Sequence, residues 1–173
     1  TWNVVVVDPF RGRSFATDTT EERHAVVPEL DDDEVVGDMV DAANRLEVEP
    51  VALVGFCMGG MYALKASASH RFDRIVSFYG MIRLPDKWRG PGQREPLRLL
   101  DHAADTTAIL SIVGTSDPYT PPDDLDALEA KGVEVVRYEG AEHAFVHDKR
   151  RPTYRPDAAA DAWARFHRHL AAT

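Results

Sequence analysis

The fold of this chain is decided by residues 51–60, which read Val51-Ala52-Leu53-Val54-Gly55-Phe56-Cys57-Met58-Gly59-Gly60. The first four residues are apolar, as in a strand buried inside a sheet. Apolar residues then recur at Met61, Leu64 and Ala68, a spacing that predicts a helix. Between this strand and this helix, Cys57 lies two residues from a glycine on either side. That is the G-x-nucleophile-x-G spacing of a tight turn that lifts a reactive side chain above a sheet.

Further apolar runs and stretches of helical spacing extend the same alternation along the chain. The runs cover 4–7, 74–79, 108–113 and 133–138. Helical spacing covers 35–46, 121–132 and the residues from about Pro156 onwards. Strands that alternate with helices predict an α/β fold, in which helices cover both faces of a mostly parallel sheet. We expect residues 1–173 to form one such domain, with 85–96 as a surface excursion.

Composition narrows the classes of protein to which the chain can belong. It has 173 residues, a formal net charge of −9 and one cysteine. The negative charge argues against binding to nucleic acid or to anionic membranes. A single cysteine excludes an intrachain disulfide, and the apolar runs are too short to span a bilayer. We therefore expect no nucleic-acid or membrane partner and a cytoplasmic location.

Two N-terminal segments carry expectations of their own. The run at 4–7 is apolar throughout, which predicts a strand covered on both faces. The acidic run at 31–34 is expected to be a solvated loop at the start of a helix, where carboxylates meet the positive end of the helix dipole. Since no ligand-like spacing follows it, we expect no metal site there.

Three reactive side chains follow three of the predicted strands, namely Cys57, Asp117 and His143. The carboxyl ends of parallel strands gather at one edge of a sheet, so these side chains are expected to meet. Their chain order of nucleophile, acid and histidine is that of the α/β-hydrolases and differs from the orders in the two well-known serine protease folds. The joint placement predicts a catalytic triad, although each residue alone has an ordinary structural explanation.

Each member of this triad has an expected role. The helix that begins after Cys57 favours a thiolate there, and the backbone N–H of Met58 would donate to an oxyanion. His143 would take the proton of Cys57 and return it to the leaving group. Asp117 would fix the tautomer of the imidazole and stabilise its charged form.

The chain resembles the dienelactone hydrolase family of α/β-hydrolases. The cysteine in the turn distinguishes this family from most other α/β-hydrolases, which have serine there. The final helix, from Asp157 to Trp163, resembles the family as well. The other matching segments, which with this helix cover nearly the whole chain in register, are Val4-Val5-Val6-Val7-Asp8, Gly55 to Gly60, Phe78-Tyr79-Gly80, Gly114-Thr115-Ser116-Asp117 and Gly140 to Phe145.

The resemblance implies a hydrolase of small lactones or carboxylic esters without a metal or organic cofactor. It implies a dienelactone (carboxymethylenebutenolide) as the type of substrate. We expect a monomer or a homodimer. Family members often bind a substrate carboxylate with arginines, and one such arginine is replaced here by His147. This replacement weakens the case for that substrate. The residues that we expect to contact substrate are Arg11, Arg23, Phe56, Tyr79 and Phe145.

The largest departure from the family lies at the N-terminus. Family members have three strands and a helix before the segment at 4–7, and the loop after the third strand supplies a second oxyanion N–H and a glutamate. That third strand lies between the strand at 4–7 and the strand at 51–54. Its absence would leave two unpaired strand edges. We expect an N-terminally truncated, three-layer α/β-hydrolase fold. Its explanations are a fragment of a longer protein, which we favour, a shortened family member that pairs its strands differently, or a non-catalytic remnant.

Several readings of the function stay open. The first is the lactone or ester hydrolase with an acyl-thioenzyme intermediate on Cys57. The second is a hydrolase-fold module that binds ligands or partners without catalysis, or an inactive fragment. A cysteine peptidase ranks last, because the turn spacing and the triad order are those of the hydrolases.

Overall fold

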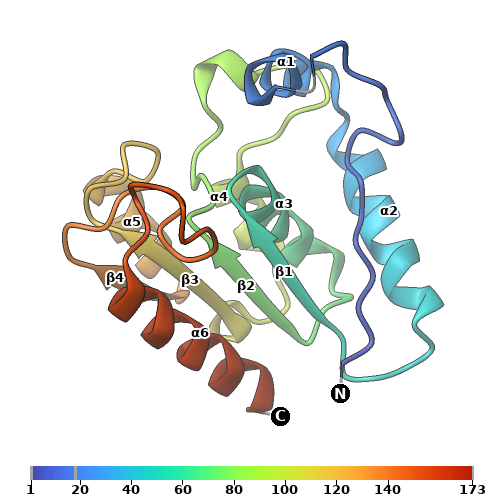
Figure 1. The fold of residues 1–173 in the computed structure, drawn as a ribbon. Coiled ribbons are helices and arrows are strands. Elements are labelled where there is room, and N and C mark those ends of the chain that lie inside the picture. Colours follow the sequence, from blue (N-terminus) through green and yellow to red (C-terminus); the bar gives the residue numbers. More distant parts are fainter. Residues whose placement is uncertain (1, 18, 173) are drawn as a thin grey trace.

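The computed structural model describes residues 2–17 and 19–172, and its centre is a four-stranded parallel sheet (Figure 1). The strands lie in the order β1-β2-β3-β4, which is also their order in the chain. Their bounds are Ala52–Phe56 (β1), Arg74–Phe78 (β2), Ile109–Gly114 (β3) and Glu134–Tyr138 (β4). Parallel pairing follows from the helical or looped crossover between each strand and the next. The predicted α/β fold with a parallel sheet is confirmed.

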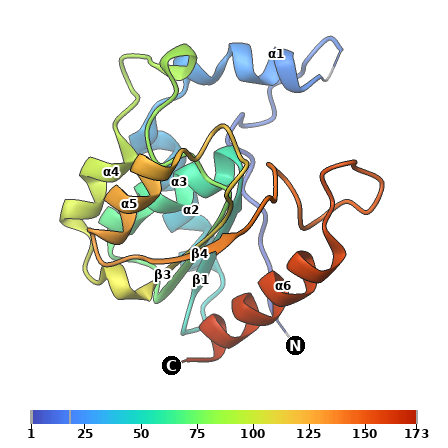
Figure 2. The ribbon, with the colours of Figure 1, turned by 90° about the vertical axis from the view of Figure 1, so that its left-hand side faces the viewer.

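Helices cover both faces of this sheet. Figure 2 shows α6 alone on one side and α2, α3, α4 and α5 on the other. The bounds are Thr20–Ala25 (α1), Asp32–Arg45 (α2), Met58–Ala66 (α3), Pro96–Leu99 (α4), Pro122–Glu129 (α5) and Pro156–Ala171 (α6). Short 3-10 turns cover Val27–Glu29, Ser67–Ser69, Asp86–Trp88, Leu100–His102 and Thr106–Ala108. None of the helices in 2–17 and 19–172 is long and apolar enough to cross a membrane.

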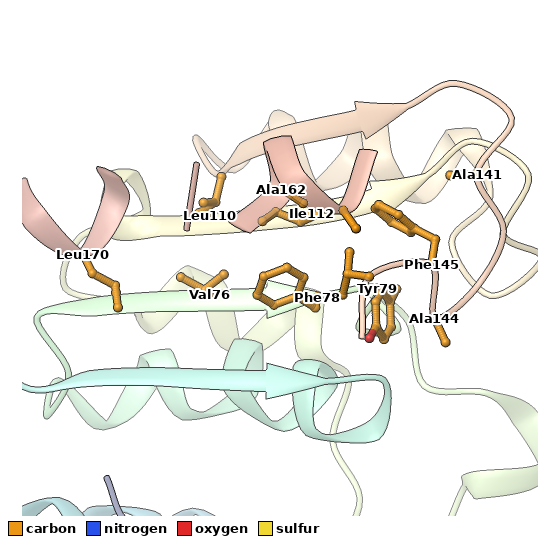
Figure 3. Close-up of a cluster of buried hydrophobic side chains, with 12 residues drawn as sticks. Val76, Phe78, Tyr79, Leu110, Ile112, Ala141, Ala144, Phe145, Ala162 and Leu170 are labelled. Carbon is orange, nitrogen blue, oxygen red and sulfur yellow. The ribbon is translucent and has the colours of Figure 1, made fainter. Parts of the chain in front are cut away.

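The core beneath α6 shows why the apolar runs became strands. Figure 3 shows Val76 and Phe78 of β2 gathered with Ile112 of β3 and Leu170 of α6. The ring of Phe78 lies 5.2 Å from that of Trp163, centroid to centroid. Each such side chain contributes about 1.5–3 kcal/mol when it is buried. Because residues of β2 and β3 are buried on both faces, their sequence is apolar without alternation.

The acidic run at 31–34 is only partly the solvated segment that we expected. Asp31 caps α2 by accepting from the backbone N–H groups of Asp33 and Glu34, as predicted for a helix start. Asp32, however, is completely buried and pairs with Lys65 of α3 at 2.7 Å. Its other oxygen accepts from the backbone N–H of Arg94, at 2.7 Å. The acidic run therefore ties the 85–96 excursion to the domain.

The expected strand at 4–7 is wrong. The structure has no strand in this segment, and Figure 1 draws it as coil outside the sheet. Val4 and Val6 are 77% and 89% exposed. A β-branched run forms a strand only when a neighbouring strand satisfies its backbone N–H and C=O groups. Among the described residues β1 pairs with β2 alone, so this segment has no such neighbour.

Candidate active site

Cys57 lies at the junction of β1 and α3 in a backbone conformation that is uncommon outside glycine. Its φ is 56° and its ψ is −119°. Its N–H donates to the carbonyl of Phe78 at 3.0 Å, and its own carbonyl accepts from Met61 at 3.0 Å. Such a conformation costs of order 1–3 kcal/mol and persists only where surrounding contacts enforce it. The turn therefore holds the half-buried thiol at the carboxyl edge of the sheet.

The glycines around Cys57 differ in how strictly they are required. A Cβ at Gly55 would lie 2.0 Å from the carbonyl oxygen of Gly59, so no side chain fits there. This agrees with the expectation that strand and helix approach closely at the turn. Gly59 does not agree with that expectation, because a Cβ at this residue would meet no atom within 4 Å. The second close approach falls on Gly60 instead, whose Cβ would lie 2.8 Å from the Cα of Gly80.

The loops after β3 and β4 are joined to each other, and this joining brings Asp117 and His143 together. Ser116 N–H donates to the carbonyl of Ala141 at 3.0 Å, and Gly140 N–H donates to the hydroxyl of Thr115 at 2.8 Å. His143 Nδ1 then lies 2.7 Å from Asp117 Oδ2. The structure thus places these two predicted residues in direct contact, although 26 residues separate them in the chain.

The protonation of His143 follows from its surroundings. A carboxylate only accepts hydrogen bonds, so Nδ1 carries the hydrogen shared with Asp117. Burial lowers the pKa of His143, but the bond to Asp117 and the neighbouring Cys57 outweigh it and raise the pKa to about 9. Cys57 is thus close enough to the ring to act on it electrostatically. His143 Nε2 is buried and has no hydrogen-bond partner of normal geometry among the described residues.

The remaining predicted contact residues fall into two groups. Tyr79 lies edge-on to the ring of His143 with 4.9 Å between centroids, and Phe56 lies 5.9 Å from the ring of His147. Phe145 is completely buried and packs against Tyr138 and Tyr79, so it belongs to the core. Of the three aromatic residues, Tyr79 contacts His143, Phe56 contacts His147, and Phe145 is part of the core.

The predicted arginines lie in other surroundings. Arg11 pairs with Asp38 at 2.6 Å and with Glu34 at 2.7 Å, both on α2. Arg23 lines a hollow of about 610 Å³ formed with residues between Val6 and Phe15. None of the three triad residues lines that hollow. The contact of Arg11 and Arg23 with a substrate stays a prediction.

Two residues near the site were missed from the sequence. Tyr119 lies edge-on to His143, with 5.0 Å between ring centroids. His24 of α1 packs edge-on against Trp88 at 4.9 Å. Burial, Lys87 and His143 lower its pKa, while Glu21 opposes them. Tyr119 could have been predicted from its position two residues after Asp117. The helix α1 could not, because its sequence is polar and has no apolar periodicity.

No cluster of three or more His, Cys, Asp or Glu side chains that could hold a metal ion occurs within 2–17 and 19–172.

Comparisons with known proteins agree with this architecture. A protein from Bradyrhizobium sp., named as a probable 2-oxo-3-(5-oxofuran-2-ylidene)propanoate lactonase, is 35% identical over 157 residues, which cover 83% of this chain and 61% of that protein. The carboxymethylenebutenolidase of Rhodococcus opacus is 28% identical, covering 97% of this chain and 71% of that protein. The chain spans only 49% and 42% of two further relatives, from Synechocystis and Saccharolobus solfataricus.

Solved structures and a family model extend the likeness to nearly the whole chain. A chain from Klebsiella pneumoniae, whose name places it among the dienelactone hydrolases, superposes with a TM-score of 0.75 at 23% identity and covers 96% of this chain and 71% of that one. The monoacylglycerol lipase of Paleococcus ferrophilus superposes with a TM-score of 0.59 at 13% identity, over 80% of this chain and 76% of that one. These two likenesses show a shared α/β-hydrolase fold. Because the model of the dienelactone hydrolase family matches residues 2–173, this chain belongs to the dienelactone hydrolase family.

Proposed function

We propose that this chain hydrolyses small lactones or carboxylic esters, with Cys57 as the nucleophile. One observation carries the proposal: His143 is held by Asp117 through Nδ1, while its buried Nε2 has no hydrogen-bond partner among the described residues and Cys57 is close enough to raise the pKa of the ring. A base held in one orientation next to a thiol on a strained turn is the arrangement that nucleophilic catalysis requires. The names of the relatives from Bradyrhizobium and Rhodococcus support the same class of reaction.

The pKa of His143 indicates that the site favours an imidazolium. Asp117 and Cys57 raise this pKa to about 9. We propose that the Cys57 thiol gives its proton to Nε2 of His143 during the reaction, so that a thiolate attacks the substrate beside an imidazolium. The thiolate is the nucleophilic form of cysteine. Asp117 balances the imidazolium through its bond to Nδ1.

The proposed reaction has two steps. In the first, the thiolate attacks the ester carbonyl, the C–O bond breaks, and the imidazolium protonates the departing alkoxide, leaving an acyl group on Cys57. In the second, neutral His143 takes a proton from water, the hydroxide attacks the thioester, and the C–S bond breaks to restore thiolate and imidazolium. Met58 is the first residue of α3, so its N–H lacks an acceptor inside the helix and can donate to the oxyanion.

The decisive experiment is hydrolysis of p-nitrophenyl esters and small lactones by the wild type and by Cys57→Ala. We expect the wild type to turn over both substrate types and the variant to lose turnover while circular dichroism shows an unchanged fold. Intact-mass spectrometry should detect an acyl group on the wild type during turnover and none on the variant. Retained hydrolysis by Cys57→Ala would falsify the mechanism.

A second candidate is a module that binds a ligand in the same site without turnover. β1 is an edge strand among the described residues, and the turn after it provides the N–H of Met58 as an oxyanion donor. A site with this one donor fits binding without turnover. Loss of one such donor costs about 10²–10³ in turnover. Fast alkylation of Cys57 by iodoacetamide, together with no hydrolysis of any activated ester, would favour this module over the enzyme.

A further inference from the structure

β1 has one edge without a partner strand, because among the described residues it pairs with β2 alone. On the β2 side, the N–H of Cys57 donates to the carbonyl of Phe78 at 3.0 Å. The carbonyl of Val51 accepts from the N–H of Asp73, just before β2, at 2.9 Å. Successive residues of a strand direct their backbone groups to opposite edges, so the odd-numbered residues face β2. The N–H and C=O groups at the open edge belong to Ala52, Val54 and Phe56.

The two edges of the described sheet differ in charge. β4 forms the other edge and exposes Glu134 and Arg137. Charged side chains on an edge strand oppose pairing with a further chain. Residues 52–56 of β1 include no charged residue. Of the two edges, that of β1 is therefore the one open to an additional strand.

Residues 2–7 have backbone groups that match such an edge. Residues 4–7 are all valine, a β-branched type that favours strands. Within the described residues, no backbone N–H or C=O group of 2–7 has a hydrogen-bond partner. Figure 1 shows the segment on the β1 side of the sheet, running in the same direction as β1 but not paired with it. The chain after it is anchored to α2 instead, through the pairs of Arg11 with Asp38 and Glu34.

We propose that two copies of this chain exchange residues 2–7, so that each segment pairs with the open edge of β1 in the other copy. A twofold axis makes the two contacts identical, and the exchange closes at a dimer. Since 2–7 runs in the same direction as β1 within one copy, an axis perpendicular to the sheet makes the incoming segment antiparallel to β1. Antiparallel pairing is the more stable kind per residue. The segment is thus coil in a single copy and a strand in the dimer.

A second copy is the occupant because each chain carries both halves of the contact. Neither half contains a charged residue, although each copy has a formal net charge of −9. The exchange therefore joins the uncharged parts of two acidic chains, where like charges do not oppose it directly. It also gives hydrogen-bond partners to the β1 edge and to 2–7 in both copies at once.

Proline substitutions in the segment test the exchange. Val4→Pro combined with Val5→Pro removes two adjacent N–H donors that point to opposite edges, so one of them faces β1 whichever way the strand is turned. In a single copy these donors have no acceptor, and circular dichroism should show an unchanged fold. Sedimentation equilibrium should give twice the chain mass of 19.3 kDa for the wild type. The dissociation constant of the proline variant should be at least about tenfold higher.

The matched control is Val4→Thr combined with Val5→Thr, which keeps β-branched side chains and both N–H donors. It should weaken the dimer less than the proline pair does. A wild type that stays monomeric at every concentration would overturn the inference. A proline pair that dimerises as tightly as the wild type would overturn it too, and so would a mass that grows beyond a dimer, because the exchange closes at two copies.

Hydrogen exchange read by NMR locates the contact on β1. In the wild type the amide of Val54 should exchange as slowly as those of Leu53 and Gly55, which face β2. In the proline pair the amide of Val54 alone should become fast. Fast exchange at Val54 in a wild-type dimer would place the interface elsewhere and overturn the inference. Slow exchange in a monomeric wild type would also overturn it, because the segment would then pair within its own chain.

Discussion

The turn at Cys57 and the bond between Asp117 and His143 are the two features on which the site depends at the scale of single residues. The turn imposes a positive φ on a residue with a side chain, and hydrogen bonds to Phe78 and Met61 hold it there. Asp117 uses both carboxylate oxygens, accepting from the backbone of Tyr119 through Oδ1 and binding His143 through Oδ2. The bond from Tyr119 thereby fixes the Asp117 carboxylate, which in turn orients the imidazole of His143.

Replacing Asp117 by Asn tests the role of that carboxylate. The side-chain amide would donate to Nδ1, so the hydrogen would move to Nε2 and block proton transfer from Cys57. We expect activity to fall by about 10⁴ and the pKa of His143 to drop from about 9, as measured by ester hydrolysis and by NMR titration of the ring.

The same variant has a signature in stability against pH. The pKa of His143 is raised from 6.5 to about 9, so its bond to Asp117 stabilises the fold fully below pH 6.5 and is lost as pH rises through about 9. The difference in unfolding free energy between wild type and Asp117→Asn should shrink over that range. A difference that grows with pH would contradict the assigned protonation of His143.

At the scale of elements, the contact between the ends of β3 and β4 decides whether the site assembles. A Cβ at Gly114, the last residue of β3, would lie 2.1 Å from the carbonyl oxygen of Ala141. The two loops can approach closely only because this residue has no side chain. The spacing of His143 after its strand is readable from the sequence, but this close approach is visible only in three dimensions.

Gly114→Ala should therefore damage both fold and site. We expect a loss of about 1–3 kcal/mol in unfolding free energy, because the loop after β4 must move away from β3. Hydrolysis should fall with it, as Asp117 and His143 separate. Gly37→Ala is the matched control, since a Cβ there meets no atom within 4 Å, and on α2 it should be neutral or stabilising by about 0.5–1 kcal/mol. Denaturant unfolding measures both.

At the scale of the whole molecule, the buried pair of Lys65 and Asp32 joins elements that are distant in the chain. Lys65 Nζ donates to both oxygens of Asp32 and, at 2.9 Å, to Oε1 of Gln93. Both charged side chains are completely buried. The pair therefore connects α2, α3 and the 85–96 excursion, and so fixes how the layers meet.

Removing one partner should destabilise the whole fold. Lys65→Met leaves the buried Asp32 carboxylate with only the more distant Arg94 guanidinium, at 3.8 Å, and we expect a loss of about 3–5 kcal/mol. Adding Asp32→Asn to that variant removes the charge, keeps an acceptor for Arg94 and should restore part of the loss. Arg137→Met is the control, because its partners Asp126 and Glu129 are exposed, and it should cost less than about 1 kcal/mol. Equal losses for the two single variants would argue against the buried pair as the link.

The sequence by itself determined the α/β class, the four strands of the sheet and the position of Cys57 in its turn, because local periodicity and glycine spacing depend on neighbouring residues. It also placed Asp117 and His143 after successive strands. The tertiary structure decided what depends on distant partners. Val4 to Val7 is coil, with Val4 to Val6 exposed, because no strand among the described residues pairs with it. Asp32 is buried against Lys65, and Phe145 is core. The contact between the Tyr79 hydroxyl and Nδ1 of His147, 68 residues later in the chain, is likewise one that no local pattern encodes.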